Sequence, residues 1–356
     1  MTLVVGSGIV GLSCALELRR RNPSAKILVL EKGVLPMGAS TKNAGFACYG
    51  SISELLSDLQ SHSEEAVYDL VLKRWEGIQL LRKNLGDEAL DFQRLGGHEI
   101  FLEEEQENFD QCMESLPKIN ALLEPIFGRS PLQENKNHFG FKGIQNSLIT
   151  HIFEGQIDTG KMMQNLIRLV YSNNIPILNN VAVQKFEESG AAVKVQTDQF
   201  EFETKKLCLA TNGFASELIN ENVKPARAQV LLTKPISGLE LKGTFHLDSG
   251  YYYFRNLDGR ILLGGGRNLD FAAEETAEFG LTSKVQNKLE QLLQSVIIPG
   301  KSFEIERRWS GIMGVGDQKI PIVKPVSDSV FCAVRLGGMG VAIGSETGKK
   351  LAEISS

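Results

Sequence analysis

A glycine turn at the start of the chain has the spacing of a dinucleotide-binding motif. Gly6, Gly8 and Gly11 form a G-x-G-x-x-G pattern between a short apolar run, residues 3–5, and a stretch of helical periodicity, residues 12–21. The first glycine allows a tight turn, the second lets the backbone approach a pyrophosphate, and the third permits close packing of helix on strand. The helix N-terminus adds free N–H donors and a dipole that favours an anion. The motif predicts a dinucleotide site, although a turn that only serves helix packing has the same glycines.

A carboxylate follows the motif at the distance expected for ribose recognition. Glu31 comes directly after the next apolar run, residues 27–30, and lies about 20 residues beyond Gly11. It can accept hydrogen bonds from the ribose hydroxyls of an adenine dinucleotide, and it would repel the 2′-phosphate of NADP. The pattern alone does not separate FAD from NAD. The cofactor-binding candidates at this end are Gly6, Gly8, Ile9, Val10, Gly11, Glu31 and Lys32.

A second segment has a composition suited to a phosphate and a flat ring. Residues 38–45, Gly-Ala-Ser-Thr-Lys-Asn-Ala-Gly, combine small residues, hydroxyl groups and one cation. Such a backbone can wrap closely around a cofactor, whereas an ordinary surface loop is the simpler alternative. The cofactor-binding candidates in this segment are Ser40, Thr41, Lys42, Asn43, Ala44 and Gly45.

The overall composition disfavours several functional classes. The 356 residues include 38 basic and 43 acidic side chains, a net charge of −5, so we expect no nucleic-acid surface. The five cysteines form no C-x-x-C pair, which is typical of reduced thiols in a cytoplasmic protein. The five histidines are isolated in the sequence, so we expect no metal site. No apolar run reaches the ~18 residues of a membrane span, so we expect no integral membrane segment.

The elements around these motifs alternate between strand and helix. Residues 3–30 have a βαβ pattern, which predicts a parallel sheet covered on both faces. The turn pairs Asp198-Gln199 and Asp258-Gly259 predict hairpins over residues 193–204 and 254–263. Helical periodicity marks residues 53–85, 160–171 and 341–354, and further strands are expected at 98–102, 206–210 and 329–334.

We therefore predict an α/β fold with two domains. The first is Rossmann-like, and the second is an α+β substrate domain built on an antiparallel sheet. Because nucleotide-type elements lie at both ends and in the middle of the chain, we expect the domains to be interleaved. The cofactor domain would comprise residues 1–85, 151–222 and 306–356, and the substrate domain residues 86–150 and 223–305.

Islands of sequence along most of the chain resemble the D-amino-acid oxidase-type FAD-dependent oxidoreductases, the group of glycine oxidase, sarcosine oxidase and γ-glutamylputrescine oxidase. The first glycine motif with Glu31 resembles their ADP-binding end, and residues 38–45 resemble their flavin motif G-A-S-x-x-x-A-G. The other islands follow in the family's order: 180–183, 209–213, Arg255 with 258–265, 308–311, Pro321, and 337–340 followed by a helix. The resemblance implies bound FAD. The further contacts it implies are Val183, Ala210, Thr211, Gly213, Gly338, Met339, Gly340 and Val341.

Two features depart from the family pattern. Glycine oxidase-like members carry an arginine two residues after the W-x-G glycine, where it binds the substrate carboxylate, and here that position is Met313. An arginine elsewhere could replace it, or each such arginine could be structural, and nearby tyrosines could form an aromatic wall or one buried face of a strand. The substrate-binding candidates are Arg255, Tyr253, Tyr251, Arg267, Arg335 and Met313. Sarcosine oxidase-like members attach the flavin through a cysteine near this segment; residues 312–314 contain none, so we expect non-covalent FAD.

The resemblance implies an FAD-dependent oxidoreductase that oxidises an amine or amino acid. A hydride would pass from a C–H next to nitrogen to flavin N5, and the resulting imine would hydrolyse. We assign no catalytic side chain, because the flavin supplies the chemistry, and oxygen or a quinone would accept the electrons. The alternatives are a 2-hydroxy acid or glycerol phosphate-type dehydrogenase and a non-catalytic flavin or nucleotide sensor. Residues 336–353 also resemble, more weakly, the oxidase domain of tRNA-wobble-modifying enzymes.

Overall fold

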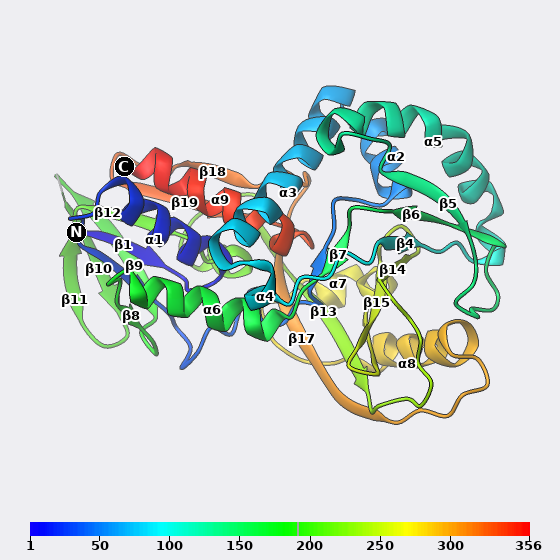
Figure 1. Ribbon diagram of the computed structural model, residues 1–356. Coiled ribbons are helices and arrows are strands. Elements are labelled where there is room, and N and C mark those ends of the chain that lie inside the picture. Colours follow the sequence, from blue (N-terminus) through cyan, green and yellow to red (C-terminus); the bar gives the residue numbers. More distant parts are fainter. Residues whose placement is uncertain (191) are drawn as a thin grey trace.

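A computed structural model describes residues 1–190 and 192–356 (Figure 1). Figure 1 shows two regions side by side, a largely parallel sheet with its helices on the left and a larger, mainly antiparallel sheet on the right. Among the described strands of the larger sheet, only β4 (Gly97–Glu99) and β14 (Thr244–Leu247) pair in parallel. Both chain ends lie beside the parallel sheet. This arrangement confirms the predicted α/β class, with a Rossmann-like sheet and a second, antiparallel one.

The parallel sheet is assembled from the beginning, the middle and the end of the sequence. Its strand order is β18-β19-β12-β1-β2-β8, and only the edge strand β18 runs antiparallel to its neighbour. The strands are β1 (Thr2–Val5), β2 (Ile27–Leu30), β8 (Ile177–Leu178), β12 (Lys206–Leu209), β18 (Ile322–Pro325) and β19 (Val330–Val334). The apolar side chains of β1, β12 and β19 are buried on both faces, as expected for a parallel sheet.

Helices cover one face of this sheet and a small antiparallel sheet covers the other. The helices are α1 (Ile9–Arg21), α3 (Glu64–Leu85), α6 (Thr159–Ser172) and α9 (Gly340–Ser355). The small sheet consists of β9 (Val183–Ser189), β10 (Ala192–Thr197) and β11 (Glu201–Thr204), and its apolar residues share a core with β1 and β12. α1 crosses α9 so closely that a Cβ atom on Gly348 would lie 2.4 Å from the carbonyl oxygen of Val10. Glycine there lets the two helices touch.

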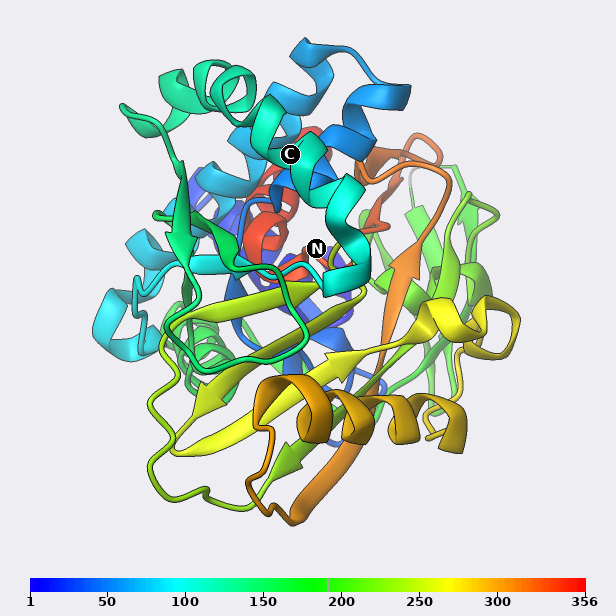
Figure 2. The same cartoon turned by 90° about the vertical axis from the view of Figure 1, so that its right-hand side faces the viewer.

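The eight-stranded sheet has the order β17-β13-β16-β15-β14-β4-β6-β5. Its strands are β4 (Gly97–Glu99), β5 (Leu132–Lys136), β6 (Ser147–His151), β13 (Lys224–Thr233), β14 (Thr244–Leu247), β15 (Tyr252–Leu257), β16 (Arg260–Gly265) and β17 (Ile305–Val315). α8 (Ser283–Leu292) and the π-helical turn Leu293–Ile297 lie across one face of it (Figure 2). We call this the outer face. The inner face is turned toward the parallel sheet and its connecting segments.

Short elements join the two regions. β3 (Phe46–Ala47) pairs with β7 (Gly155–Gln156), and α2 (Ile52–Ser61) follows β3. The remaining helices are α4 (Asp87–Leu90), α5 (Gln106–Phe127) and α7 (Phe271–Glu274), with 3₁₀ turns at Ala39–Thr41, Glu103–Glu105, Asn212–Glu217 and Arg267–Leu269. In the part of the chain that is described, no helix is both long and apolar enough to cross a membrane. Within the same residues the five cysteines are buried and form no disulfide.

Most predicted elements are confirmed, and the differences have local causes. Both predicted hairpins are present, as β10–β11 and β15–β16. The helical stretch predicted at residues 53–85 is two helices, because the Ser63 hydroxyl accepts from the N–H of Ala66 and caps the start of α3. The predicted domain boundaries stay a prediction. One strand does not follow them: β17 falls in the segment assigned to the cofactor domain but pairs along its length with β13 of the eight-stranded sheet.

Candidate active site

The glycine turn connects β1 to α1 as the motif requires. Gly6 has φ +103°, and a Cβ atom on it would lie 2.7 Å from the carbonyl oxygen of Ala210 at the end of β12. A Cβ atom on Gly11 would lie 1.9 Å from the carbonyl oxygen of Gly6. Both positions therefore need glycine. α1 begins at Ile9, with Val10 next and no acidic residue in its first turn, so its N-terminus suits an anion.

Glu31 is bonded to the glycine turn itself. One carboxylate oxygen accepts from the backbone N–H of Ser7 at 3.1 Å and from its hydroxyl at 2.6 Å, and the other accepts from the N–H of Gly33 at 3.0 Å. The residue is only 7% exposed. Because a carboxylate offers about four acceptor positions, one remains for a ribose hydroxyl. The neighbouring Lys32 lies over the ring of Phe214.

Residues 38–45 run from the glycine turn to the eight-stranded sheet. At one end the Ser40 hydroxyl accepts from the N–H of Ile9 at 3.0 Å. At the other end Trp309 of β17 donates its ring N–H to the carbonyl oxygen of Lys42 at 3.0 Å. Within the segment, Thr41 donates to the carbonyl oxygen of Gly38 and the Asn43 side chain accepts from the N–H of Gly45. These bonds fix a backbone strap between the two regions.

The last glycine cluster lies beside the residue that follows β3, just beyond this strap. α9 opens at Gly340 and Val341 with no acidic residue in its first turn. The sulfur of Met339 lies 3.5 Å from that of Cys48, which follows β3. Cβ atoms added to Gly337, Gly338 and Gly340 would meet no atom within 4 Å, so the backbone of this loop faces open space.

The other predicted cofactor contacts lie at the carboxyl end of β12 and in β9. Ala210 follows β12 and packs on Gly6, and the buried hydroxyl of Thr211 has no hydrogen-bond partner among the described residues. Gly213 lies against the backbone of Met313, and Val183 begins β9. Space at the glycine cluster, an unpaired hydroxyl and an uncapped helix N-terminus together fit an adenine dinucleotide with a flavin end.

The predicted arginines are mostly occupied by the protein. Arg255 is 4% exposed and donates to the carbonyl oxygens of Ala44 at 2.6 Å and Ile157 at 3.1 Å. Arg335 is 8% exposed and donates to the carbonyl oxygens of Ile320 and Asn222. These bonds brace backbone segments, and they disfavour a role in binding a substrate carboxylate.

The four other substrate candidates lie at different places. Arg267 lies over the ring of Phe271, and Tyr251 packs edge-on against the same ring at 5.9 Å, on the outer side of the sheet. Tyr253 instead contacts Phe46, with ring centroids 5.6 Å apart, on the inner face. Met313 lies in β17 against the turn that contains Gly213. The geometry therefore brings Tyr253 to the cofactor strap, while Tyr251 and Arg267 lie away from it.

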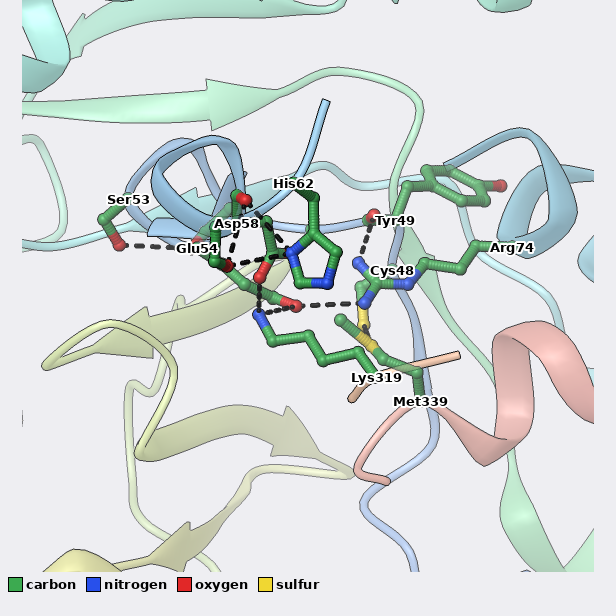
Figure 3. Close-up of polar contacts among 12 residues, drawn as sticks. Cys48, Tyr49, Ser53, Glu54, Asp58, His62, Arg74, Lys319 and Met339 are labelled. Carbon is green, nitrogen blue, oxygen red and sulfur yellow. Dashed lines mark hydrogen bonds and ion pairs between the residues drawn. The ribbon is translucent and has the colours of Figure 1, made fainter. Parts of the chain in front are cut away.

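A buried charged network next to Cys48 was not predicted from the sequence (Figure 3). Arg74 of α3 is 1% exposed and donates to the carbonyl oxygen of Tyr49 at 2.8 Å and to the Glu54 carboxylate at 3.0 Å. Lys319 pairs with Glu54 at 3.1 Å and with Asp58 at 2.7 Å. Burial alone would raise the pKa of Glu54, but Arg74 and Lys319 outweigh it and lower the pKa to about 2. Glu54 is therefore an ionised carboxylate in a balanced cluster.

Two further carboxyl groups hold the segment between β3 and α2. Glu154 is 2% exposed and accepts from the backbone N–H groups of Tyr49 and Gly50. Glu99 of β4 accepts from the hydroxyl of Ser51 and from both the N–H and the hydroxyl of Ser53. Burial raises the pKa of each carboxyl group to about 7. Both residues come from the region of the eight-stranded sheet and fix the start of α2 against it.

Comparison with known proteins identifies the family. A family model described as FAD dependent oxidoreductase, DAO, matches residues 1–354. A probable oxidoreductase, OrdL, of Haemophilus influenzae is 20% identical, over 98% of this chain and 81% of that protein. The structure of glycine oxidase from Geobacillus kaustophilus has a TM-score of 0.79 at 17% identity and covers 100% of this chain and 95% of its own. L-proline dehydrogenase from P. horikoshii has a TM-score of 0.78 at 16% identity, over 99% of this chain and 92% of its own. These structures share the fold, and the match over nearly the whole chain shows that the protein belongs to the DAO family of FAD-dependent oxidoreductases.

Proposed function

We propose that this protein uses non-covalently bound FAD to oxidise a small amine or amino acid. The observation that carries the proposal is the convergence of three loops, 6–11, 38–45 and 337–341, beside the inner face of a large antiparallel sheet. The family and the fold shared with an amino acid oxidase and an amino acid dehydrogenase support the same reaction class. We expect oxygen or a quinone to accept the electrons. We also expect a cytoplasmic protein, since scattered cysteines without a C-x-x-C pair are typical of reduced thiols.

The residues that would hold FAD divide along its length. Gly6 to Gly11 and the α1 N-terminus would hold the pyrophosphate, and Glu31 the adenosine ribose. The strap 38–45 and the α9 N-terminus would hold the flavin end, where backbone N–H groups favour negative charge. Bound FAD would supply a two-electron acceptor for a C–H bond next to nitrogen. The sheet would orient the substrate and exclude water from it.

The test is the visible spectrum of the purified holoprotein followed by a substrate panel. We expect a flavin spectrum, and a yellow supernatant over a colourless pellet after acid precipitation. The holoprotein is then mixed anaerobically with amines, D- and L-amino acids and 2-hydroxy acids in turn. We expect at least one of the nitrogen compounds to bleach the flavin band. Bleaching only by hydroxy acids, or by no compound, would contradict the proposal, and a yellow pellet would contradict non-covalent binding.

A further inference from the structure

The inner face of the eight-stranded sheet carries a histidine opposite the cofactor strap. In the sheet register His246 of β14 lies directly beside Tyr253 of β15 and Glu99 of β4. Side chains at paired positions of neighbouring strands point to the same face, so these three share the inner face. Phe46 of β3 packs edge-on against His246, with ring centroids 5.2 Å apart, and against Tyr253. Since Phe46 directly follows the strap 38–45, His246 lies on the side that the substrate would occupy.

One ring nitrogen of His246 lacks a hydrogen-bond partner among the described residues. This atom, Nε2, is buried. A buried polar nitrogen without a partner is costly, and one explanation for keeping it is a ligand that supplies the missing bond. Burial lowers the pKa of His246 to about 4, although the Glu54 carboxylate opposes the shift. The ring is therefore neutral at ordinary pH and can accept a hydrogen bond.

Another histidine shows that an unpaired ring nitrogen is not sufficient evidence by itself. His98 of β4 also has a buried Nε2 without a partner, but its register partner is Phe245, whose ring it stacks on at 4.9 Å. Phe245 belongs to the apolar core beneath α8, so His98 faces the outer side. His151 of β6 has two buried ring nitrogens without a partner, but its ring packs against Tyr49, Phe127 and Phe153. Among the described residues, His246 alone combines an unpaired ring nitrogen with a ring contact to Phe46. His98 and His246 thus form a matched pair on opposite faces.

We propose that His246 is a substrate-binding residue whose imidazole accepts a hydrogen bond from the amine nitrogen of the substrate. The inference rests on the proposed amine oxidation and names a specificity determinant for it. The acceptor suits a nitrogen that carries hydrogen, and Phe46 and Tyr253 would enclose the adjoining carbon atoms. A hydroxy acid could donate its hydroxyl to the same acceptor, but the neutral imidazole and phenol would give its carboxylate no cationic partner.

The experiment compares three variants as holoproteins. His246→Leu removes the acceptor, His246→Gln keeps a polar group near the position of Nε2, and His98→Gln alters the matched histidine of the outer face. Anaerobic flavin reduction by the most reactive amine of the panel gives an apparent Kd and a limiting rate for each. Benzylamine, as a probe, is titrated against the flavin spectrum. Flavin content and thermal midpoint are recorded for every variant.

We expect His246→Leu to weaken amine binding about tenfold, the size of one neutral hydrogen bond, with flavin content unchanged. His246→Gln should recover much of the affinity, and His98→Gln should change the thermal midpoint but not the Kd. Wild-type amine affinity in His246→Leu, or an equal loss of amine affinity in His98→Gln, would overturn the inference. Neither result would contradict amine oxidation itself. If no amine bleaches the wild-type flavin, the proposed function fails first and this inference falls with it.

Discussion

Replacing Glu31 with alanine should affect both the glycine turn and the adenosine end of the cofactor. The substitution removes the acceptor of three hydrogen bonds, from the N–H and hydroxyl of Ser7 and the N–H of Gly33. A hydrogen bond to a charged group contributes about 1.5–3 kcal/mol, and the bonds share one carboxylate, so their contributions are not additive. We expect the apoprotein to lose roughly 3 kcal/mol of unfolding free energy. Loss of the ribose contact should weaken FAD binding roughly ten- to hundredfold.

The control for this prediction is Ser7→Ala, which loses only the 2.6 Å hydroxyl bond and keeps the carboxylate. Calorimetric titration of the apoproteins with FAD and with ADP separates the two roles of Glu31. Glu31→Ala should bind both ligands more weakly by a similar factor, and turnover should recover at saturating FAD. Ser7→Ala should be less stable than the wild type but bind ADP with nearly normal affinity. Unchanged ADP affinity in Glu31→Ala, or an equal loss in both variants, would refute ribose recognition by Glu31.

Three further predictions concern buried charged residues. Arg255→Met should lower the flavin content because it leaves the carbonyl oxygen of Ala44 in the strap without its donor, while the KM of the remaining holoenzyme stays the same. Normal flavin content with a raised KM would instead identify Arg255 as a substrate ligand. Arg74→Met should lower the free energy of unfolding by about 3–5 kcal/mol, because Glu54 loses its buried partner. Adding Glu54→Gln should recover part of that loss in chemical unfolding. If the losses of the two single variants simply add in the double variant, the pairing is contradicted. Glu154 has a folded-state pKa of about 7, above its unfolded value, so the folded state binds the extra proton and stability falls as pH rises between those values. Urea unfolding across that range measures how steeply the free energy of unfolding falls with pH. This slope should be smaller in Glu154→Gln by up to ~1.4 kcal/mol per pH unit, and an unchanged slope would contradict a raised pKa of Glu154.

The predictable parts of the fold are those that depend on the spacing of residues close together in the sequence. The glycine motif, the β1–α1–β2 unit and the hairpins at 198–199 and 258–259 depend on residues close together in sequence. The split between α2 and α3 was missed because one serine cap interrupts an otherwise continuous helical pattern. The pairing of β17 with β13 joins residues about eighty apart, and such pairing has no local signal in the sequence.

The candidate site divides in the same way. Its cofactor half consists of backbone loops whose glycines mark them in the sequence, and the structure brings those loops together. The charged network of Arg74, Glu54 and Lys319 joins three distant segments, and each residue alone reads as an ordinary surface charge. His246 was passed over as an isolated histidine. Only the strand register, which puts it beside Tyr253 and under Phe46, distinguishes it from His98.

The distribution of charge indicates how the substrate is recognised. Arg255 and Arg335 donate to backbone carbonyl oxygens, and Lys319 is held by Glu54 and Asp58, so none of these cations is free for a substrate carboxylate. The groups that Phe46 contacts on the inner face are a neutral imidazole and a phenol. A neutral acceptor with aromatic walls binds an amine through its N–H and its apolar carbons, without requiring a carboxylate. If His246 binds the substrate as proposed, we expect amines to be preferred over simple amino acids. Met313→Arg should then shift the preference toward amino acids by supplying a bidentate partner for the carboxylate.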